Sequence, residues 1–581
     1  MQHYYQHFRK LNQALIDVIY QIVNQNLAIR SITIQKVLLN FCNIEITLSW
    51  INQIIKKKNI KRPQGRPDKN YYLAEKEQYF ASVKTVIIKN YDKIGIPLMQ
   101  DLMDHFNLNN LFVSLLEKIK AELNNKRFQC KDGTFTDFIK TMTAVTLDPS
   151  VSNFEEAINA DISHCPMSIA QTRDLVKYLE TSSLIDEANI VHRDYWIHFL
   201  AIQNNAIMIY YDGHAKPYYS KENHVSGLIS NSQKILPGTK YFVVTTNNGY
   251  ILEIRNIRID TPYGKTVYET TKELIQDHPD IAKLVIMDRE GSGTELNKHI
   301  FDDLNVPTLT PLRSNMYKGL DDFGYKQIGP NKYQGKWRDP DKRANDPRWF
   351  IIIKYHNRYC VFATNAKKNM GPQAQGLYKT RWPDNEEIIK NLNMLCSFNT
   401  NICNGTKKIL NPKKIKQKKL LENKIKTANQ RITQYQNTGS ECEKNSEKKR
   451  YEKQIENQSN KMNQYQEELK KLEHIEMVKV RNTKPDQFVS LLKAGILNLF
   501  RYILILCLDL KDKKAPMEKM MQMIINRKGK IIESNYLKHY IFERPYTKEN
   551  YRLLNLFCKN FNKLNILTKT GKKIILSLDS S

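Results

Sequence analysis

The sequence has few cysteines for its length, and no pattern links them. Nine cysteines are spread over 581 residues, and none belongs to a CxxC motif. The 13 histidines form no HxH or HExxH motif. The chain therefore lacks the ligand spacing of a structural zinc site and the framework of a disulfide-stabilised domain, and we expect free thiols in a reducing compartment.

Long apolar runs are also missing. The first residues, MQHYYQHFRKLNQ, contain no apolar segment of the kind found in signal peptides. The most apolar segment, 491–510, is interrupted by Lys493 and Arg501, and its longest uninterrupted run is too short to cross a bilayer. We therefore predict a buried helix there and a cytoplasmic protein without a membrane partner.

Negative charge is scarce relative to positive charge. The chain has 90 lysines and arginines against 60 acidic residues, a formal net charge of +30. Such an excess favours a polyanionic partner, of which nucleic acid is the most common. A membrane surface is the alternative, but it usually requires a basic amphipathic helix and an anchor. The length is enough for three or four domains.

The N-terminal segment, residues 1–70, predicts a small helical domain. Two short helices are expected at 33–43 and 47–59, joined by a three-residue turn, with Thr47 as the N-cap of the second. This arrangement favours a helix-turn-helix that lays its second helix in the major groove of DNA. A three-helix bundle with a lysine-rich end is the alternative.

The predicted DNA contacts of this domain are all basic. The basic segment 61–69 contains Gly65, Arg66 and Pro67 and has the composition either of an arm in the minor groove or of an ordinary linker. The expected contact residues are Lys56, Lys57, Lys58, Arg62 and Arg66.

The rest of the chain divides by its periodicity. Residues 71–200 are mostly helical and carry no recognisable chemistry, as expected of a scaffold or a further DNA-binding region. From 206 the pattern predicts a strand, a hairpin turning at Asn247-Asn248-Gly249, a helix, a strand, a helix and a strand. That order predicts a mixed α/β core. The predicted regions are the α/β core at 201–313 and 371–411, an antiparallel β-rich insertion at 314–370, a basic coiled-coil hairpin at 412–480 and a small α/β region at 481–581.

Two segments of this organisation leave an alternative open. The apolar seam of the expected coiled coil contains Gln, Tyr and Ala, so 412–480 is either a helical hairpin or disordered. The β insertion carries Trp337 and Trp349 among basic residues. These aromatics either stack on distorted DNA ends or form a small β core.

Three acidic residues are the candidate chemistry. Asp212 and Asp288 each follow an apolar run that predicts a strand ending in a carboxylate, and Glu386 lies in the first turn of a later helix. The carboxyl ends of parallel strands meet at one edge of a sheet, where α/β proteins place their sites. Three converging carboxylates need cations between them, and two Mg²⁺ or Mn²⁺ ions would satisfy that charge. Taken singly, each acid has a simpler structural explanation: Asp212 and Asp288 are of the type that forms turns, and Glu386 favours the start of a helix.

The three acidic segments resemble a known family. YYDGHAKPYYS, VIMDREGSG and YKTRWPDNEEIIKNL look like the acidic segments of the DDE transposases of bacterial insertion sequences. Tyr378, Arg381, Glu386 and Lys390 match the tyrosine, arginine, glutamate, lysine signature of that family. The resemblance covers the chain from about residue 200 to the end, and includes the tail of one subgroup that carries DGH after its first strand.

The resemblance implies a fold and a reaction. It implies a ribonuclease H-like core in which Asp212, Asp288 and Glu386 bind two divalent ions. The implied activity is cleavage at transposon ends, followed by attack of the 3′-hydroxyl on target DNA. Its partners would be the terminal inverted repeats, target duplex and a second copy of the chain in a nucleoid-associated synaptic complex. Arg381 and Lys390 would contact DNA phosphates, and Tyr378 would stack on or hydrogen-bond an end nucleotide.

One departure from the family pattern concerns spacing. Four residues, 382–385, separate Arg381 from Glu386, where the family usually has three. Lys390 follows Glu386 at the expected four-residue step, which favours Glu386 over Asp384 or Glu387 as the third acid. The alternatives are a catalytically inactive, domesticated DNA-binding protein and a nuclease that hydrolyses DNA without strand transfer. An RNA-binding scaffold built on the basic coiled coil is a further alternative.

Overall fold

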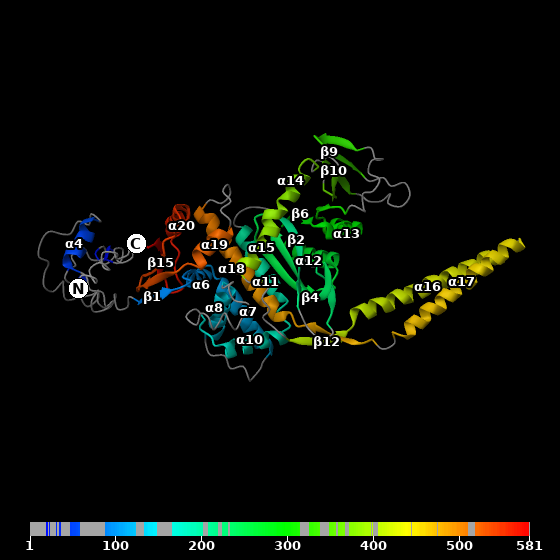
Figure 1. The fold of residues 1–581 in the computed structure, drawn as a ribbon, viewed down its shortest axis with the longest axis horizontal. Coiled ribbons are helices and arrows are strands. Elements are labelled where there is room, and N and C mark those ends of the chain that lie inside the picture. Colours follow the sequence, from blue (N-terminus) through cyan, green and yellow to red (C-terminus); the bar gives the residue numbers. More distant parts are fainter. Residues whose placement is uncertain are drawn as a thin grey trace.

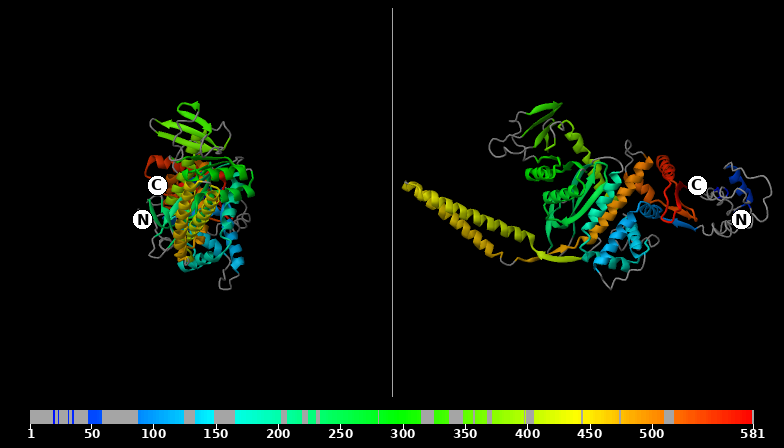
Figure 2. Two further views of the ribbon diagram at one scale, coloured as in Figure 1. Left: turned by 90° about the vertical axis from the view of Figure 1, so that its right-hand side faces the viewer. Right: turned by 180° about the vertical axis from the view of Figure 1, so that it is seen from behind.

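A computed structural model describes most of the chain (Figure 1). The described ranges are 47–57, 87–123, 133–147, 165–201, 207–218, 224–229, 233–279, 281–313, 325–336, 348–355, 358–366, 371–396, 405–442, 444–472, 475–508 and 517–579, with a few isolated residues besides. The described part is a mixed α/β protein with an elongated shape: the helical hairpin α16–α17 projects from one end and helix α4 lies at the other (Figures 1 and 2).

The central sheet is built around one long strand, β2 (Ile207–Pro217). The strand order is β5-β4-β2-β6-β7, in which β4 (Lys234–Thr246) is antiparallel to both β2 and β5 (Ile251–Arg258). On the other side of β2, β6 (Ala282–Met287) and β7 (Thr308–Pro311) run parallel to it. Helices α12 (Tyr263–Asp277) and α13 (Thr294–Leu304) make the connections that parallel strands require.

The hairpin predicted at Asn247-Asn248-Gly249 is confirmed. Gly249 adopts a φ of +70°, a left-handed conformation that glycine reaches without strain. The predicted strands and helices of the core are likewise present, with one correction. The strand expected to end at Asp212 continues to Pro217, because its antiparallel pairing with β4 extends as far as Pro217↔Gly238.

The β-rich insertion is confirmed as antiparallel strands and extends the central sheet. Its strands β8 (Lys326–Gly329), β9 (Lys332–Lys336), β10 (Trp349–Tyr355) and β11 (Arg358–Thr364) form a meander. β11 pairs with β7, placing Phe362 opposite Pro311, and with β3 (Ser226–Ile229) added beside β4 the sheet has ten strands. The sequence did not predict this continuity.

The apolar segment near 491–510 forms the predicted buried helix. This helix, α18 (Lys484–Leu508), is the one helix of the described residues with the length and hydropathy of a membrane span, and 72% of its most apolar window is buried inside the protein. Its Asn498 side chain bonds both the N–H and the carbonyl of Ile251 at 2.8 Å, and Gln487 bonds the N–H of Asn256 at 2.7 Å. Both partners lie on β5, so α18 satisfies the exposed backbone of that strand.

The remaining helices pack around α18 or beside a second sheet. The helices of the first half are α6 (Gly95–His105), α7 (Leu108–Leu123), α8 (Thr134–Thr146), α10 (Ile169–Thr181) and α11 (Glu187–Ala201). The second sheet has the strand order β1-β14-β15-β16. Its strands are β1 (Ile87–Tyr91), β14 (Gly529–Glu533), β15 (Leu537–Phe542) and β16 (Lys573–Leu578). The last two helices of this region are α19 (Met517–Ile525) and α20 (Lys548–Phe561). The α/β region predicted at 481–581 therefore has strands and helices as expected, whereas β14 and the addition of β1 from the first half were not predicted.

The coiled-coil hairpin is confirmed as two long helices. They are α16 (Pro412–Ser440) and α17 (Asn445–Lys470), with a stem formed by β12 (Thr406–Leu410) and β13 (Met477–Arg481). The predicted seam is the less exposed face of each helix, and Leu421 and Ala428 are its buried members on α16. Tyr435 and Tyr451 meet across it with ring centroids 6.2 Å apart.

The second of the two predicted N-terminal helices is present as α4 (Leu48–Lys57). Thr47 caps it, because its side-chain oxygen accepts a hydrogen bond from the backbone N–H of Trp50 at 3.3 Å. Lys56 is exposed on this helix. The first predicted helix, apart from Ile34 and Gln35, lies outside the described residues, as do the side chain of Lys57 and all of Lys58, Arg62 and Arg66.

Candidate active site

Asp212 occupies the point where the two pairings of β2 diverge. The parallel pairing with β6 ends at Tyr211↔Met287, and the antiparallel pairing with β4 continues past Asp212↔Val243. Asp212 and Asp288 each follow that last parallel pair by one residue, so they are neighbours at the carboxyl end of β6. The two acids therefore lie side by side as predicted, but Asp212 is within β2 and not at its end.

Asp288 is held by its own backbone. It precedes the short 3-10 helix η1 (Arg289–Gly291), and its carbonyl accepts hydrogen bonds from the Gly291 N–H at 2.8 Å and the Thr310 hydroxyl at 3.1 Å. The Tyr378 hydroxyl donates to the Asp288 carboxylate at 3.4 Å. Tyr378 comes from α14 (Ala374–Lys379), so the signature tyrosine fixes an acid of the site.

The extra residue before Glu386 is accommodated by a π-helical turn. Residues Trp382–Glu386 form the π-helix η5, which continues directly into α15 (Glu387–Leu395). The helix predicted to have Glu386 in its first turn thus lies at 382–395. A π-turn bonds residue i to i+5 and absorbs one inserted residue, so Arg381 and Glu386 still share a face. Asn385, fully buried, anchors the turn to β4 through a 2.9 Å hydrogen bond to Thr245.

Arg381 lies between two of the acids. One of its terminal nitrogens is 3.2 Å from the Asp212 carboxylate, and the other makes an ion pair with Glu386. The residue is only 3% exposed, so its charge is directed inward. The family resemblance implies that Arg381 contacts DNA phosphates. In the described structure its partners are instead the carboxylates of the site.

The electrostatics show that the three acids share one environment. Burial raises the pKa of Asp212 to about 6, and the charges of Asp288 and Glu386 act in the same direction, while Arg381 and a hydrogen bond from Gly213 oppose them. Burial also raises the pKa of Tyr378 to about 12, so the phenol keeps the proton that it donates to Asp288. Three carboxylates against one guanidinium leave this centre short of positive charge.

This donor set fits divalent cations. Its ligands are carboxylate oxygens, which Mg²⁺ and Mn²⁺ prefer, and its charge deficit calls for further cations. In the part of the chain that is described, no three His, Cys, Asp or Glu side chains already converge as the ligands of one ion do. Asp212, Asp288 and Glu386 would therefore hold metal after the Arg381 guanidinium moves away from two of them.

The neighbouring acids have other partners, which supports the choice of Glu386. Asp384 is 3.9 Å from Arg501 of α18, and burial raises its pKa to about 7. Glu387 is exposed. Lys390 is also exposed, one helical turn after Glu386. His214 lies two residues beyond Asp212 and packs near Phe398, with ring centroids 6.1 Å apart.

Lys240 is a basic residue of the site that sequence reasoning missed. Its ammonium group is 3.1 Å from Glu290, in the segment that follows Asp288, and lies over the ring of Tyr263. Its side chain crosses Gly213, where an added Cβ would be 2.3 Å from the Lys240 Cε. The DGH motif gave the only sequence signal, because a glycine beside a candidate acid allows close approach by another chain segment.

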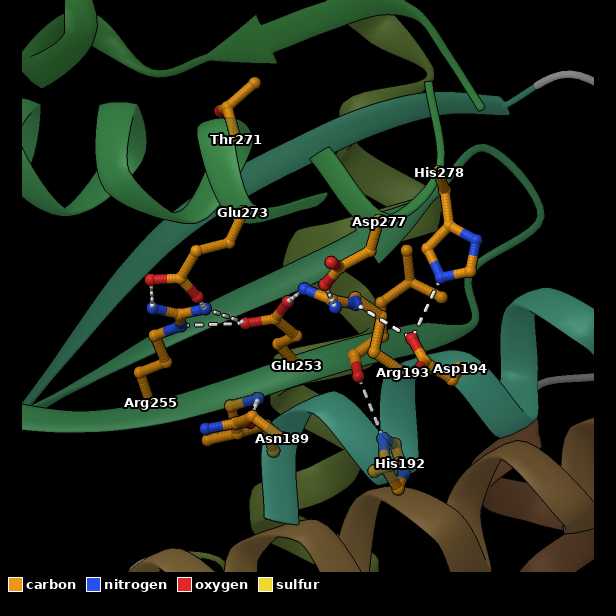
Figure 3. Close-up of polar contacts among 12 residues, drawn as sticks. Asn189, His192, Arg193, Asp194, Glu253, Arg255, Thr271, Glu273, Asp277 and His278 are labelled. Carbon is orange, nitrogen blue, oxygen red and sulfur yellow. Dashed lines mark hydrogen bonds and ion pairs between the residues drawn. The ribbon is translucent and has the colours of Figure 1, made fainter. Parts of the chain in front are cut away.

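A second charged cluster connects strand β5 of the central sheet to the helices packed beside it (Figure 3). The fully buried Arg193 of α11 is 3.0 Å from Glu253 of β5 and also pairs with Asp277 of α12. Arg255 joins Glu253 to Glu273, so the cluster ties one strand to two helices. Beside it, the Tyr211 hydroxyl bonds Thr271 at 2.8 Å. Because Tyr211 immediately precedes Asp212, these contacts support the strand that carries the first acid.

The cysteines and the two tryptophans of the β insertion can also be compared with the predictions. The six described cysteines, Cys165, Cys360, Cys396, Cys442, Cys507 and Cys558, are free thiols, as predicted. Trp349 lies in β10, and Trp337 lies outside the described residues.

Comparisons of the chain with protein-family models, with curated proteins and with solved structures found no match in any of the three.

Proposed function

We propose that this protein is a DDE transposase of the insertion-sequence type, which binds transposon ends and catalyses metal-dependent cleavage and transfer of DNA strands. The observation that carries the proposal is the gathering of Asp212, Asp288 and Glu386, from three distant segments, around Arg381 and Tyr378. These five side chains include three of the four residues of the family signature and both aspartates of its acidic motifs.

The topology of the core supports the same proposal. A meander of three antiparallel strands, β2, β4 and β5, is followed by two strands parallel to β2, with helices in the connections. This arrangement agrees with the ribonuclease H-like core that the sequence resemblance implies. The acids lie on the central strand, after its parallel neighbour and on an adjacent helix.

The proposed mechanism assigns a task to each residue of the site. Asp212, Asp288 and Glu386 would hold two Mg²⁺ or Mn²⁺ ions, and such ions would supply activation of the attacking water or hydroxyl and stabilisation of the leaving oxygen. Tyr378 orients the Asp288 carboxylate through its hydrogen bond. Arg381 pairs with Asp212 and Glu386, offsets part of their negative charge, and would be available to a phosphate that enters the site. Lys240 and the exposed Lys390 provide positive charge on either side of the acids.

The proposed partners follow from charge and architecture. With a net charge of +30, the protein would hold DNA mainly by its phosphates. The lysine-bearing helix α4, as the second helix of a helix-turn-helix, would contact the terminal inverted repeats. Two transposon ends must be brought together, so the active form would be a homodimer on the bacterial nucleoid.

The proposal is tested by DNA cleavage. Purified protein with Mg²⁺ is expected to nick duplex DNA carrying the repeats that flank its gene and to join the ends to a target plasmid. Asp212→Asn should abolish nicking and leave DNA binding within about twofold, because the substitution removes a metal ligand and keeps the side-chain shape. Equal nicking by the wild type and the variant would show that Asp212 is not catalytic.

A DNA-binding protein without catalysis is the second candidate. The ion pairs that Arg381 makes with Asp212 and Glu386 favour it, because they occupy two of the three acids. Mn²⁺ titration separates the two functions: a competent site binds Mn²⁺ far more tightly than a variant lacking all three acids, and an inactive one does not. A nuclease without strand transfer would bind Mn²⁺ and nick DNA but yield no joined products.

A further inference from the structure

The positive charge of the helical hairpin α16–α17 is concentrated on one part of one helix. Helix α16 carries seven lysines and one arginine against a single glutamate, whereas α17 carries six basic residues against five glutamates. All seven lysines of α16 fall between Lys413 and Lys426, in the half next to the stem. Two more lysines, Lys407 and Lys408, precede them on the exposed strand β12.

The hairpin itself does not use this charge. Only Leu421 and Ala428 of α16 are buried, and α17 has no buried residue, so the two helices meet along a narrow seam. Among the described residues, no ion pair joins Lys407, Lys408 or the seven lysines of α16 to a carboxylate. Lys424 is the one that contacts a partner on α17, the ring of Tyr465, at 5.0 Å. Like charges at this density repel one another, and a polyanion relieves that repulsion.

The stem places these lysines near the candidate active site. Val478 and Val480 of β13 are buried in an apolar cluster with Val225, Ile229 and Ile259 of the core. The backbone N–H of Val225 bonds the Lys479 carbonyl at 3.1 Å. Ala215 of β2 packs on the same cluster, only three residues after Asp212, which is about 10 Å along the strand. The stem from which the basic half of α16 extends is therefore packed against the strand that carries Asp212.

We propose that the stem-side half of α16, with β12, is a docking surface for the phosphate backbone of duplex DNA held at the active site. The seven lysines of α16 span 13 residue steps, about 20 Å of helix. Duplex DNA presents a phosphate charge about every 1.7 Å of its axis, so several contacts fit this length. The surface recognises charge and not sequence, and it serves flanking or target DNA alike. The inference rests on the proposed function, because it takes duplex DNA as the substrate of the acids.

The test compares two triple variants of the full-length protein. The first is Lys413→Gln, Lys416→Gln and Lys419→Gln, three exposed positions near the stem. The matched control is Lys448→Gln, Lys449→Gln and Arg450→Gln, which removes the same charge from exposed positions of α17 near the far end of the hairpin. Binding of a 40-base-pair duplex is measured by fluorescence anisotropy between 50 and 300 mM NaCl, and circular dichroism verifies the fold of each variant.

The stem-side variant should bind about tenfold more weakly, and its slope of log affinity against log salt should fall by about 3, one for each lost phosphate contact. The control should stay within twofold of the wild type with an unchanged slope. Equal losses in the two variants, or none in either, would overturn the proposal. A changed oligomeric state of the stem-side variant in light scattering, with unchanged DNA affinity, would mean that the surface contacts a second copy instead.

Failure of the docking surface can be told apart from failure of the proposed function. If the wild type nicks DNA and both triple variants bind and nick as it does, the function holds and the docking surface is wrong. If the wild type binds duplex DNA and loses affinity only in the stem-side variant, yet never nicks with Mg²⁺, the docking surface holds and the catalytic proposal is wrong.

Discussion

The Arg381 guanidinium lies 3.2 Å from the Asp212 carboxylate and balances part of the charge of that acid. The same group pairs with Glu386, so one cation serves two of the three predicted ligands. The five-residue step from Arg381 to Glu386 allows this because the intervening turn is π-helical. Arg381 thus acts as an internal counter-ion.

Removing this counter-ion should make the stability of the folded protein depend more strongly on bound metal. Arg381→Met leaves three acids without a cation, so the metal-free protein should unfold more easily, by about 1–3 kcal/mol. The same change should tighten Mn²⁺ binding, because the ion no longer competes with the guanidinium. Thermal unfolding with EDTA and with increasing Mn²⁺ measures both effects. Arg381→Lys is the control that keeps the charge, and a Met variant that binds Mn²⁺ more weakly than the wild type would contradict the counter-ion role.

The choice of the third acid can be tested by neighbouring substitutions. Glu386→Gln should reduce metal-dependent nicking by about 10³-fold or more, because it removes a metal ligand. Glu387→Gln, at an exposed position one residue later, should change nicking by less than twofold. Single-turnover nicking assays compare the two. Loss of activity in the Glu387 variant alone would move the third ligand by one position and would mean that the π-turn misaligns Glu386.

Lys240 and Gly213 should act on activity through one side chain. Lys240→Ala removes the ammonium group beside Glu290, and Gly213→Ala introduces a Cβ that must displace the end of the same lysine. Each should weaken DNA cleavage several-fold with a change in stability below about 1 kcal/mol, because the group that is removed or displaced is the flexible end of a lysine side chain and its partner Glu290 is half exposed. The double variant should be no worse than the worse single variant. Additive losses would show that the two residues act independently.

The buried His192 predicts the acid sensitivity of the fold. Its Nδ1 bonds the Leu252 carbonyl at 2.9 Å and its Nε2 accepts from the Trp196 indole at 3.2 Å, which requires a neutral ring. Burial lowers its pKa from 6.5 to about 4. A lowered histidine pKa gives stability that is complete above pH 6.5 and is lost as the pH falls toward 4, about 2 kcal/mol between pH 7 and pH 5.

Denaturant unfolding across this range measures the loss of stability. His539, whose pKa burial also lowers to about 4, adds an effect of the same sign. His192→Asn should flatten the pH dependence, whereas His299→Asn, at an exposed position of α13, should leave it unchanged. An unaltered pH profile in the His192 variant would show that this histidine does not titrate on unfolding.

The buried cluster of Figure 3 should be important for stability. Glu253→Gln removes the charge of the buried partner of Arg193, which is itself fully buried, and should destabilise the protein by about 3–5 kcal/mol. Glu269→Gln breaks the exposed pair with Lys265 on the neighbouring surface of α12 and should cost less than about 0.5 kcal/mol. Denaturant unfolding distinguishes the two. Similar small effects would mean that water reaches the cluster.

Much of the local structure was predictable because it depends on residues that are close in the chain. The hairpin at Asn247-Asn248-Gly249, the strands before the two aspartates and the helical hairpin all follow from turn chemistry or periodicity. The site residues could be chosen because Asp212 and Asp288 follow apolar runs and Glu386 lies at a helix start. Lys240 escaped prediction, because its place beside Asp212 depends on the pairing of β4 with β2.

The sequence by itself determined the basic charge, the alternation of strands and helices, the helical seam and the identity of the three acids, since each is expressed in composition or in a short period. Only the tertiary structure decided that β1 joins β14, that β11 extends the central sheet, that β2 passes through the site, and that Arg381 turns inward to the carboxylates. These relationships join segments tens to hundreds of residues apart or depend on which face of a helix is buried. Packing and charge compensation select them, and neither leaves a signal in the local pattern of residues.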